Sequence, residues 1–226
     1  MTHGRHRLLI AAALTAATLT AATLVTGCQS DAGGTGGGAA PLSLSGLTKT
    51  ADGMSDVGES ACPLPYDVAE AAKTAGLNGT KAAGSVEDDT APVATAEGGK
   101  RARPWEPLAK NPGVLVSCTF HIGEDDVQVH TVATRKPQAI APLAPMVQTL
   151  SGSSVDDLVV YMKRAGDAKP GDAVVTDSGN VAAVRLKLDG DGDAYLLVGL
   201  GEAGTGSPDR RQQVGDLAGA LAGQVQ

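Results

Sequence analysis

Alternation of apolar and polar residues is the feature of this sequence that most limits how the chain can fold. From Val114 to Ile122 every even-numbered residue is apolar, and polar side chains fill the odd positions from Ser117 onward. A period of two is typical of a strand with one buried face, so Cys118 is expected on the core side. Aromatic residues make up only 2% of the chain, so the core must come from Val, Leu, Ile and Ala.

A second strand is expected directly after the first, in VQVHTVAT, residues 127–134. A two-residue loop at Glu124-Asp125 would pair Ile122 with Val127, apolar against apolar. In this register both strands of the hairpin present one common face to the core.

Three more strands are expected in the second half, at residues 172–177, 181–188 and 194–200. The even-numbered residues of the last two strands form one apolar face. To keep both sets on that face, the loop between them needs an odd number of residues, three or five, because an even loop would place Leu186 opposite Tyr195.

Three segments have helical spacing and helix-end signals: residues 63–76, residues 153–166, and a terminal helix that begins at Ser207-Pro208-Asp209. The first is expected to end at Gly76. In the other two, the residues expected to face the core are Val155, Leu158, Val159 and Met162, and then Val214, Leu217, Leu221 and Val225.

The order of these elements predicts an α+β domain of two layers. We expect a mainly antiparallel sheet of about five strands, with helices packed on one face. A Pro-rich crossover through Pro137, Pro142 and Pro145 would connect the first hairpin to the second helix.

Residues 77–113 are polar and interrupted by Gly and Pro, which indicates a long surface loop. Within it Lys100, Arg101, Arg103 and Trp105 are a candidate partner contact, because Arg and Trp recur at binding hot spots. The alternative, which we favour, is a solvated loop whose Trp covers an edge of the core.

The first 27 residues have a short basic start followed by an apolar run, which is typical of a secretion signal. A retained transmembrane helix is the alternative, since the run just reaches the lower length of a span. The segment LVTGC, ending at Cys28, resembles the lipobox of bacterial lipoproteins. The resemblance implies that residues 1–27 are removed as a signal peptide and that Cys28, the new N-terminus, carries acyl chains such as palmitate on the outer face of the cytoplasmic membrane.

Residues 28–60 are rich in Gly and lack periodicity, which favours a flexible, lipid-anchored tether of about 30 Å. A single extracytoplasmic domain would then occupy residues 61–226. Thiols outside the cytoplasm tend to oxidise, and Cys62 and Cys118 are the two that remain once Cys28 is lipidated. A disulfide between them is expected, and no C-x-x-C motif points to redox catalysis.

Three features resemble a family of actinobacterial lipoproteins of unknown function. They are Cys62 at the head of an Ala-rich helix, Cys118 beside an aromatic residue in CTF, and the Ala-rich LAGALAGQV at residues 217–225. Phe120 stands where the family usually has Trp. The resemblance covers residues 60–226 and implies a domain of the cell envelope with no established activity.

No metal or cofactor site is expected. The run DGDGD, residues 189–193, suggests calcium, but it lacks the spacing of an EF-hand and Asp-Gly steps are ordinary turn sequences. His121 and His130 would lie diagonally opposed on the outward face of the first hairpin, with no third ligand in register.

A net charge of −7 argues against nucleic-acid binding. The common hydrolase motifs G-x-S-x-G, S-x-x-K and H-E-x-x-H are absent from the sequence. We therefore expect a membrane-anchored binding or scaffolding domain that recruits an envelope protein or a small ligand without catalysis. The alternative is an enzyme that acts on cell-wall or extracellular substrates through a site without a recognisable motif.

Overall fold

A computed structural model of the chain describes residues 41–54, 61–77, 82–83, 94–95, 102, 107–204 and 207–226. All of these belong to one unit of the chain, Gly38–Gln226. Cys28, Lys100, Arg101, Arg103 and Trp105 lie outside the described residues.

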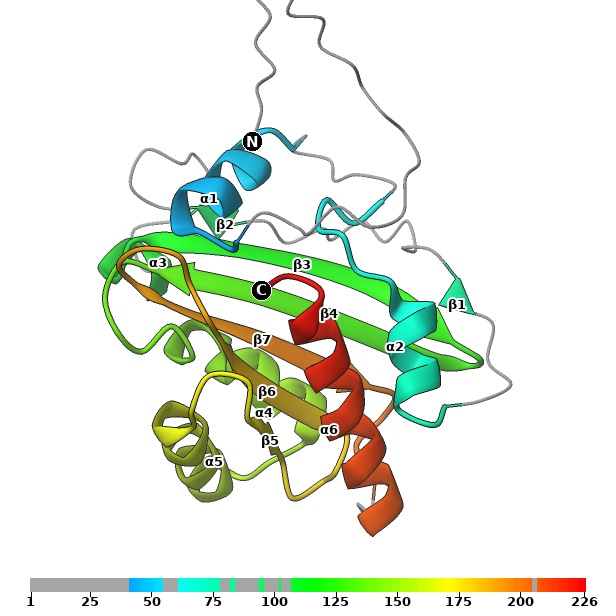
Figure 1. Cartoon of the computed structure of the whole chain (residues 1–226). Coiled ribbons are helices and arrows are strands. Elements are labelled where there is room, and N and C mark those ends of the chain that lie inside the picture. Colours follow the sequence, from blue (N-terminus) through cyan, green and yellow to red (C-terminus); the bar gives the residue numbers. More distant parts are fainter. Residues whose placement is uncertain are drawn as a thin grey trace, which may run out of the picture. The chain divides into compact units, whose positions relative to one another are not determined.

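The described residues form short helices around a set of long strands (Figure 1). The helices are α1 (Leu44–Asp52), α2 (Val68–Thr74), α3 (Pro107–Lys110), α4 (Ala144–Ser151), α5 (Val155–Asp167) and α6 (Pro208–Gly223), with a 3-10 turn, η1 (Ala141–Leu143), before α4. The strands are β1 (Ala82–Ala83), β2 (Ala94–Thr95), β3 (Gly113–Ile122), β4 (Asp125–Thr134), β5 (Ala173–Val175), β6 (Val181–Leu186) and β7 (Asp193–Leu200).

The sheet is antiparallel throughout, with the order β1-β3-β4-β7-β6-β5, and β2 also pairs with β3. Strands β3 to β7 are the five expected from the sequence, while β1 and β2 are two-residue additions at the outer edge of β3. The α+β class and the mainly antiparallel sheet are confirmed.

Helices cover both faces of this sheet, which differs from the expectation that they pack on one. Helices α1, α2 and α6 pack against the even-numbered residues of β3, β6 and β7. On the opposite face α3, η1, α4 and α5 cover residues that include Leu115, Val132, Tyr195 and Leu197. All eight residues of β7 are buried, because this central strand is apolar on both of its faces. The fold therefore has three layers instead of two.

The expected flexible tether at residues 28–60 is wrong for residues 41–54, which contain α1. The Ser43 side chain accepts a hydrogen bond from the backbone N–H of Gly46 and caps the helix. Leu47 and Ala51, four residues apart, face the core and are 2% and 0% exposed. Helix α1 lies over β3 (Figure 1), so the folded unit begins earlier than the sequence predicted.

The first hairpin turns at Gly123-Glu124, not at Glu124-Asp125. Ile122 pairs with Asp125, and Phe120 pairs with Val127. Gly123 has φ +65, the positive value that a tight two-residue hairpin turn requires. The register differs by two residues from the prediction, which leaves every side chain on its expected face.

The loop between β6 and β7 has an odd number of residues, as expected, but it is longer than expected. Leu186 pairs with Ala194, and Arg185 lies opposite Tyr195. The residues 187–193 beyond the last pair are odd in number, which keeps the even-numbered residues of both strands on one face. The expected length of three or five residues was too short.

The disulfide between Cys62 and Cys118 is confirmed, with 5.5 Å between the two Cα atoms. It joins the segment before α2 to the middle of β3. Helix α2 ends just before Gly76, whose φ is +70, as expected for a glycine beyond a helix C-terminus.

The predicted helices form, but not every predicted face is right. Helix α6 is capped by Ser207 and buries Val214, Leu217 and Leu221 as expected, and Val225 is buried just beyond its end. In α5, Leu158 and Met162 pack against the core as expected, but Val155 and Val159 are 64% and 63% exposed. Tyr161 and Ala165 are the buried residues of this helix. Part of the Pro-rich crossover is itself helical: Pro142 and Pro145 lie in the first turns of η1 and α4, where no N–H is needed, and Pro137 precedes both.

Candidate functional site

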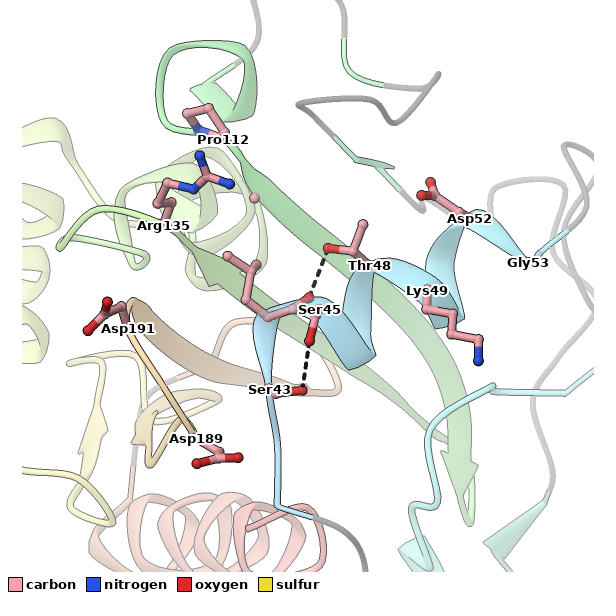
Figure 2. A pocket seen from close by; sticks show the side chains of 12 residues that line it. Ser43, Ser45, Thr48, Lys49, Asp52, Gly53, Pro112, Arg135, Asp189 and Asp191 are labelled. Atoms are coloured by element: carbon pink, nitrogen blue, oxygen red, sulfur yellow. Dashed lines mark hydrogen bonds between the residues drawn. The ribbon is translucent and has the colours of Figure 1, made fainter.

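A groove of about 960 Å³ opens beside α1. It is lined by one side of α1, the beginning of β3, the end of β4 and the loop between β6 and β7 (Figure 2). Segments that are far apart in the sequence therefore line one groove.

Backbone hydrogen bonds hold the walls of the groove together. The N–H of Asp189 donates to the carbonyl of Leu42 at 2.7 Å, and a parallel bridge links Asp189 to Ser43. At the other wall, the N–H of Arg135 donates to the carbonyl of Pro112 at 2.9 Å. The segment that leads into α1 is thus fastened directly to the β6–β7 loop.

Hydroxyl groups of α1 line the groove but are engaged within the helix. The Oγ of Ser43 accepts from the N–H of Gly46 at 3.1 Å. The hydroxyl of Thr48 donates to the carbonyl of Leu44 at 2.8 Å, and Ser43 contacts Ser45 (Figure 2). The described lining includes no histidine or cysteine. Among the described residues, the hydroxyls of Ser43, Ser45 and Thr48 thus hydrogen-bond to backbone groups and to one another, and not to a side chain that could act as their base.

Side chains of both charges surround the groove. Asp189 and Asp191 lie on the β6–β7 loop, and Lys49 and Asp52 project from α1 on its other side (Figure 2). The carboxylate of Asp52 accepts a hydrogen bond from the Thr95 hydroxyl at 3.1 Å, which orients it. This arrangement suits a polar ligand that carries both an anionic and a cationic group.

A second hollow of about 620 Å³ adjoins the first. It shares Lys49 and Gly53 with the groove and extends to Cys62 and Pro63 beside the disulfide. Helix α1 therefore borders two hollows that have Lys49 in common.

The DGDGD segment is a turn that contains one structural carboxylate. Asp193 is 4% exposed, and its Oδ1 accepts from Nε of Arg185 at 2.9 Å. Its Oδ2 accepts from the backbone N–H groups of Gln138 and Ala139 at 2.9 and 3.0 Å. Among the described residues, no group of three or more His, Cys, Asp or Glu side chains could hold a metal ion.

The two histidines of the first hairpin are not a pair. The expectation of two exposed imidazoles in diagonal contact is wrong, because the register places His130 opposite Ser117 and His121 opposite Asp126. His121 Nδ1 lies 2.7 Å from the Asp126 carboxylate. His130 is only 6% exposed, since its side of the sheet is covered by the second helical layer.

His130 forms a buried pair with Ser117, with 2.7 Å between Nδ1 and Oγ. Its Nε2 has no hydrogen-bond partner among the described residues. Burial lowers the pKa of His130 from 6.5 to about 4, so the ring is neutral at physiological pH. A histidine beside a serine is suited to nucleophilic catalysis, but this pair lies inside the core where substrate has no access.

Two tyrosines are further buried titratable groups. Tyr66 and the Thr131 hydroxyl are 2.5 Å apart, and burial raises the pKa of Tyr66. Burial also raises the pKa of Tyr161, whose hydroxyl donates to the carbonyl of Val174. Both phenols are therefore neutral, and their hydrogen bonds join helices or loops to the sheet.

Sequence reasoning missed the groove because it assigned α1 to the tether. The signal was present: Ser43 is a good N-cap residue, and Leu44, Leu47 and Ala51 follow at helical spacing. Nothing local to Asp189 or Arg135 could have placed them beside α1, since that contact depends on the sheet order.

Among the described residues, no helix is both long and apolar enough to cross a membrane. Comparisons of the chain with protein-family models, with curated proteins and with solved structures found no match.

Proposed function

We propose that this chain is a lipid-anchored, extracytoplasmic binding domain that carries out no chemistry, and that the groove beside α1 holds its ligand. The anchor would be an acyl-modified Cys28 on the outer face of the cytoplasmic membrane. The lipobox-like segment that ends at Cys28 supports this placement, as does the Cys62–Cys118 disulfide, which is typical of oxidising compartments.

The composition of the groove is the observation that favours binding over catalysis. Its hydroxyls are occupied by helix capping and backbone hydrogen bonds. Charged groups of both signs line its open hollow. Such a site can orient a polar molecule through several hydrogen bonds, and the hydrogen bonds of its α1 hydroxyls go to backbone groups and to other hydroxyls and not to a base.

The same chemistry suggests the class of ligand. Lys49 matches a carboxylate, Asp189 and Asp191 match an ammonium group, and the nearby backbone suits sugar hydroxyls. Soluble fragments of a bacterial cell wall, in which short peptides with free amino and carboxyl groups are joined to sugars, combine these features. We propose this class as the ligand.

Titration calorimetry of the full chain with a disaccharide–peptide wall fragment tests this proposal. Binding is expected in the micromolar to millimolar range, and Lys49→Ala and Asp189→Ala should each weaken it about tenfold, the effect of one charged hydrogen bond. Lys73→Ala and Asp209→Ala, which remove exposed charges distant in sequence from the groove, are the matched controls. Absence of binding would overturn the proposal, and cleavage of the fragment, detected by mass spectrometry, would favour the enzyme instead.

The anchor is tested separately from the ligand. Cells grown with radiolabelled palmitate should incorporate the label into the wild-type chain and not into a Cys28→Ala variant. Label in both chains, or in neither, would contradict the assignment of Cys28.

A further inference from the structure

The exposed large apolar side chains of the described residues are concentrated on one helix. Val155, Val159 and Val160 of α5 are 64%, 63% and 58% exposed. Single exposed apolar residues are common on protein surfaces, but three within two turns form a patch that is costly to leave in water.

Helix α5 cannot rotate to bury these valines. The Tyr161 hydroxyl donates to the carbonyl of Val174 at 3.1 Å, and the Arg164 guanidinium donates to the carbonyl of Val175 at 2.7 Å. The carbonyl of Ala165 accepts from the Tyr195 hydroxyl at 3.2 Å. These bonds fix the opposite side of α5 against β5 and β7, so the valine side stays outward.

Two of the charges beside the valines are arranged symmetrically along the helix. Asp156 lies three residues before Val159, and Lys163 lies three residues after Val160. The Lys163 ammonium donates to the exposed Asp167 carboxylate of its own helix at 2.6 Å, a solvent-exposed contact that it would exchange for, or share with, a carboxylate of a second copy. If a second α5 lay antiparallel across the first, with a twofold axis between Val159 and Val160, each Asp156 would lie opposite the Lys163 of the other copy. The valines would meet at the centre of the contact. A self-complementary surface of this kind is what a twofold dimer requires.

We propose that α5 is a dimer interface in which a second copy of this chain packs its own α5 antiparallel against the valine patch. An anionic membrane surface is a poorer match, because Asp156 and Asp157 occupy the same end of the helix and would be repelled.

The interface is small, so its strength depends on concentration. One helix face is at the low end of specific interfaces, below about 1,200 Å² in total, and such contacts are weak and reversible. Copies anchored to one membrane would reach a higher local concentration, which favours such a contact. This inference does not depend on the ligand of the groove.

Sedimentation equilibrium of the full chain in density-matched detergent, up to about 1 mM, tests the proposal, since weak interfaces associate in that range. The wild type should show a monomer–dimer equilibrium. Val159→Glu should abolish dimerisation, because it places two like charges beside the axis. Asp209→Lys, in the exposed first turn of α6, is the matched control and should leave the equilibrium unchanged.

Charge reversal distinguishes this geometry from a general loss of stability. Asp156→Lys alone, and Lys163→Asp alone, should each raise the dissociation constant about tenfold through like-charge contacts. When the two variants are mixed, each lysine meets an aspartate, and heterodimers should form with about wild-type affinity. A wild type that stays monomeric, an equilibrium unaffected by changes in α5, or a mixture without heterodimers would overturn the proposal.

Discussion

His130 is a neutral imidazole buried on the face of the sheet that α3, η1, α4 and α5 cover. Its pKa in the folded protein is about 4, against 6.5 for an exposed histidine. Between these two values the unfolded chain binds the proton and the folded chain does not, so acidification favours unfolding. The stability that His130 contributes is present above about pH 6.5 and is lost as pH falls toward 4.

We predict that the free energy of unfolding decreases by about 2 kcal/mol between pH 7 and pH 5 because of His130 alone. A His130→Gln variant, which keeps a polar group near Ser117, should lose this part of the pH dependence. Urea titrations at the two pH values measure it. His121→Gln is the control, and an equal flattening in that variant would show that the effect does not come from the buried ring.

At the scale of single residues, the sequence predicted which face of the sheet a side chain occupies better than it predicted whether that side chain is buried. Alternation placed every residue of the first hairpin on its correct face, because a register error of two residues preserves the face. It could not show that His130 was buried, since that depends on helices α3 to α5 covering the face that was expected to meet solvent.

Helix α1 is the element whose presence changes the functional interpretation most. Its inward residues Leu47 and Ala51 belong to the same core as α2 and α6, and its outward residues line the groove. The helix is short, and most of its stability must come from packing instead of helix propensity. Losing that packing should disturb the groove as well as the core.

We predict that Leu47→Ala lowers the free energy of unfolding by about 3 kcal/mol, the usual cost of emptying a buried leucine site. Ser45→Ala, on the exposed side of α1, should change it by less than about 0.5 kcal/mol. Chemical denaturation measures both. Equal stability of the Leu47→Ala variant and the wild type would mean that α1 is not part of the cooperative fold.

The helices with strong end signals were predicted correctly because capping is local. Ser154 and Ser207 accept hydrogen bonds from the first turns of α5 and α6. The inward face of α5 was predicted correctly for Leu158 and Met162 and wrongly for Val155 and Val159, because both sides of this helix carry apolar residues. Only the contacts of Tyr161 with the sheet decide between them.

At the scale of the whole molecule, the disulfide connects the region before α2 to β3 across 56 residues of sequence. Its effect on stability comes largely from restricting the unfolded chain. The pairing was predictable from the cysteine count. The three-layer arrangement was not, because it required recognising that β7 is apolar at almost every position.

We predict that replacing Cys62 and Cys118 by serine lowers the free energy of unfolding by about 4 kcal/mol, the loop-closure value for a loop of this length. Denaturant titrations of the wild type, with and without reductant, should show the same difference. An unchanged midpoint after complete reduction would contradict this prediction.

The early start of α1 also limits how far the domain can travel. With an acyl chain on Cys28, only residues 29–40 separate the lipid from the first described residue, Pro41. The fully extended length of that stretch is at most about 45 Å, less than half the extended length of a tether that ends at residue 60. Under the anchor proposed above, binding would be confined to molecules that come within this shell above the bilayer.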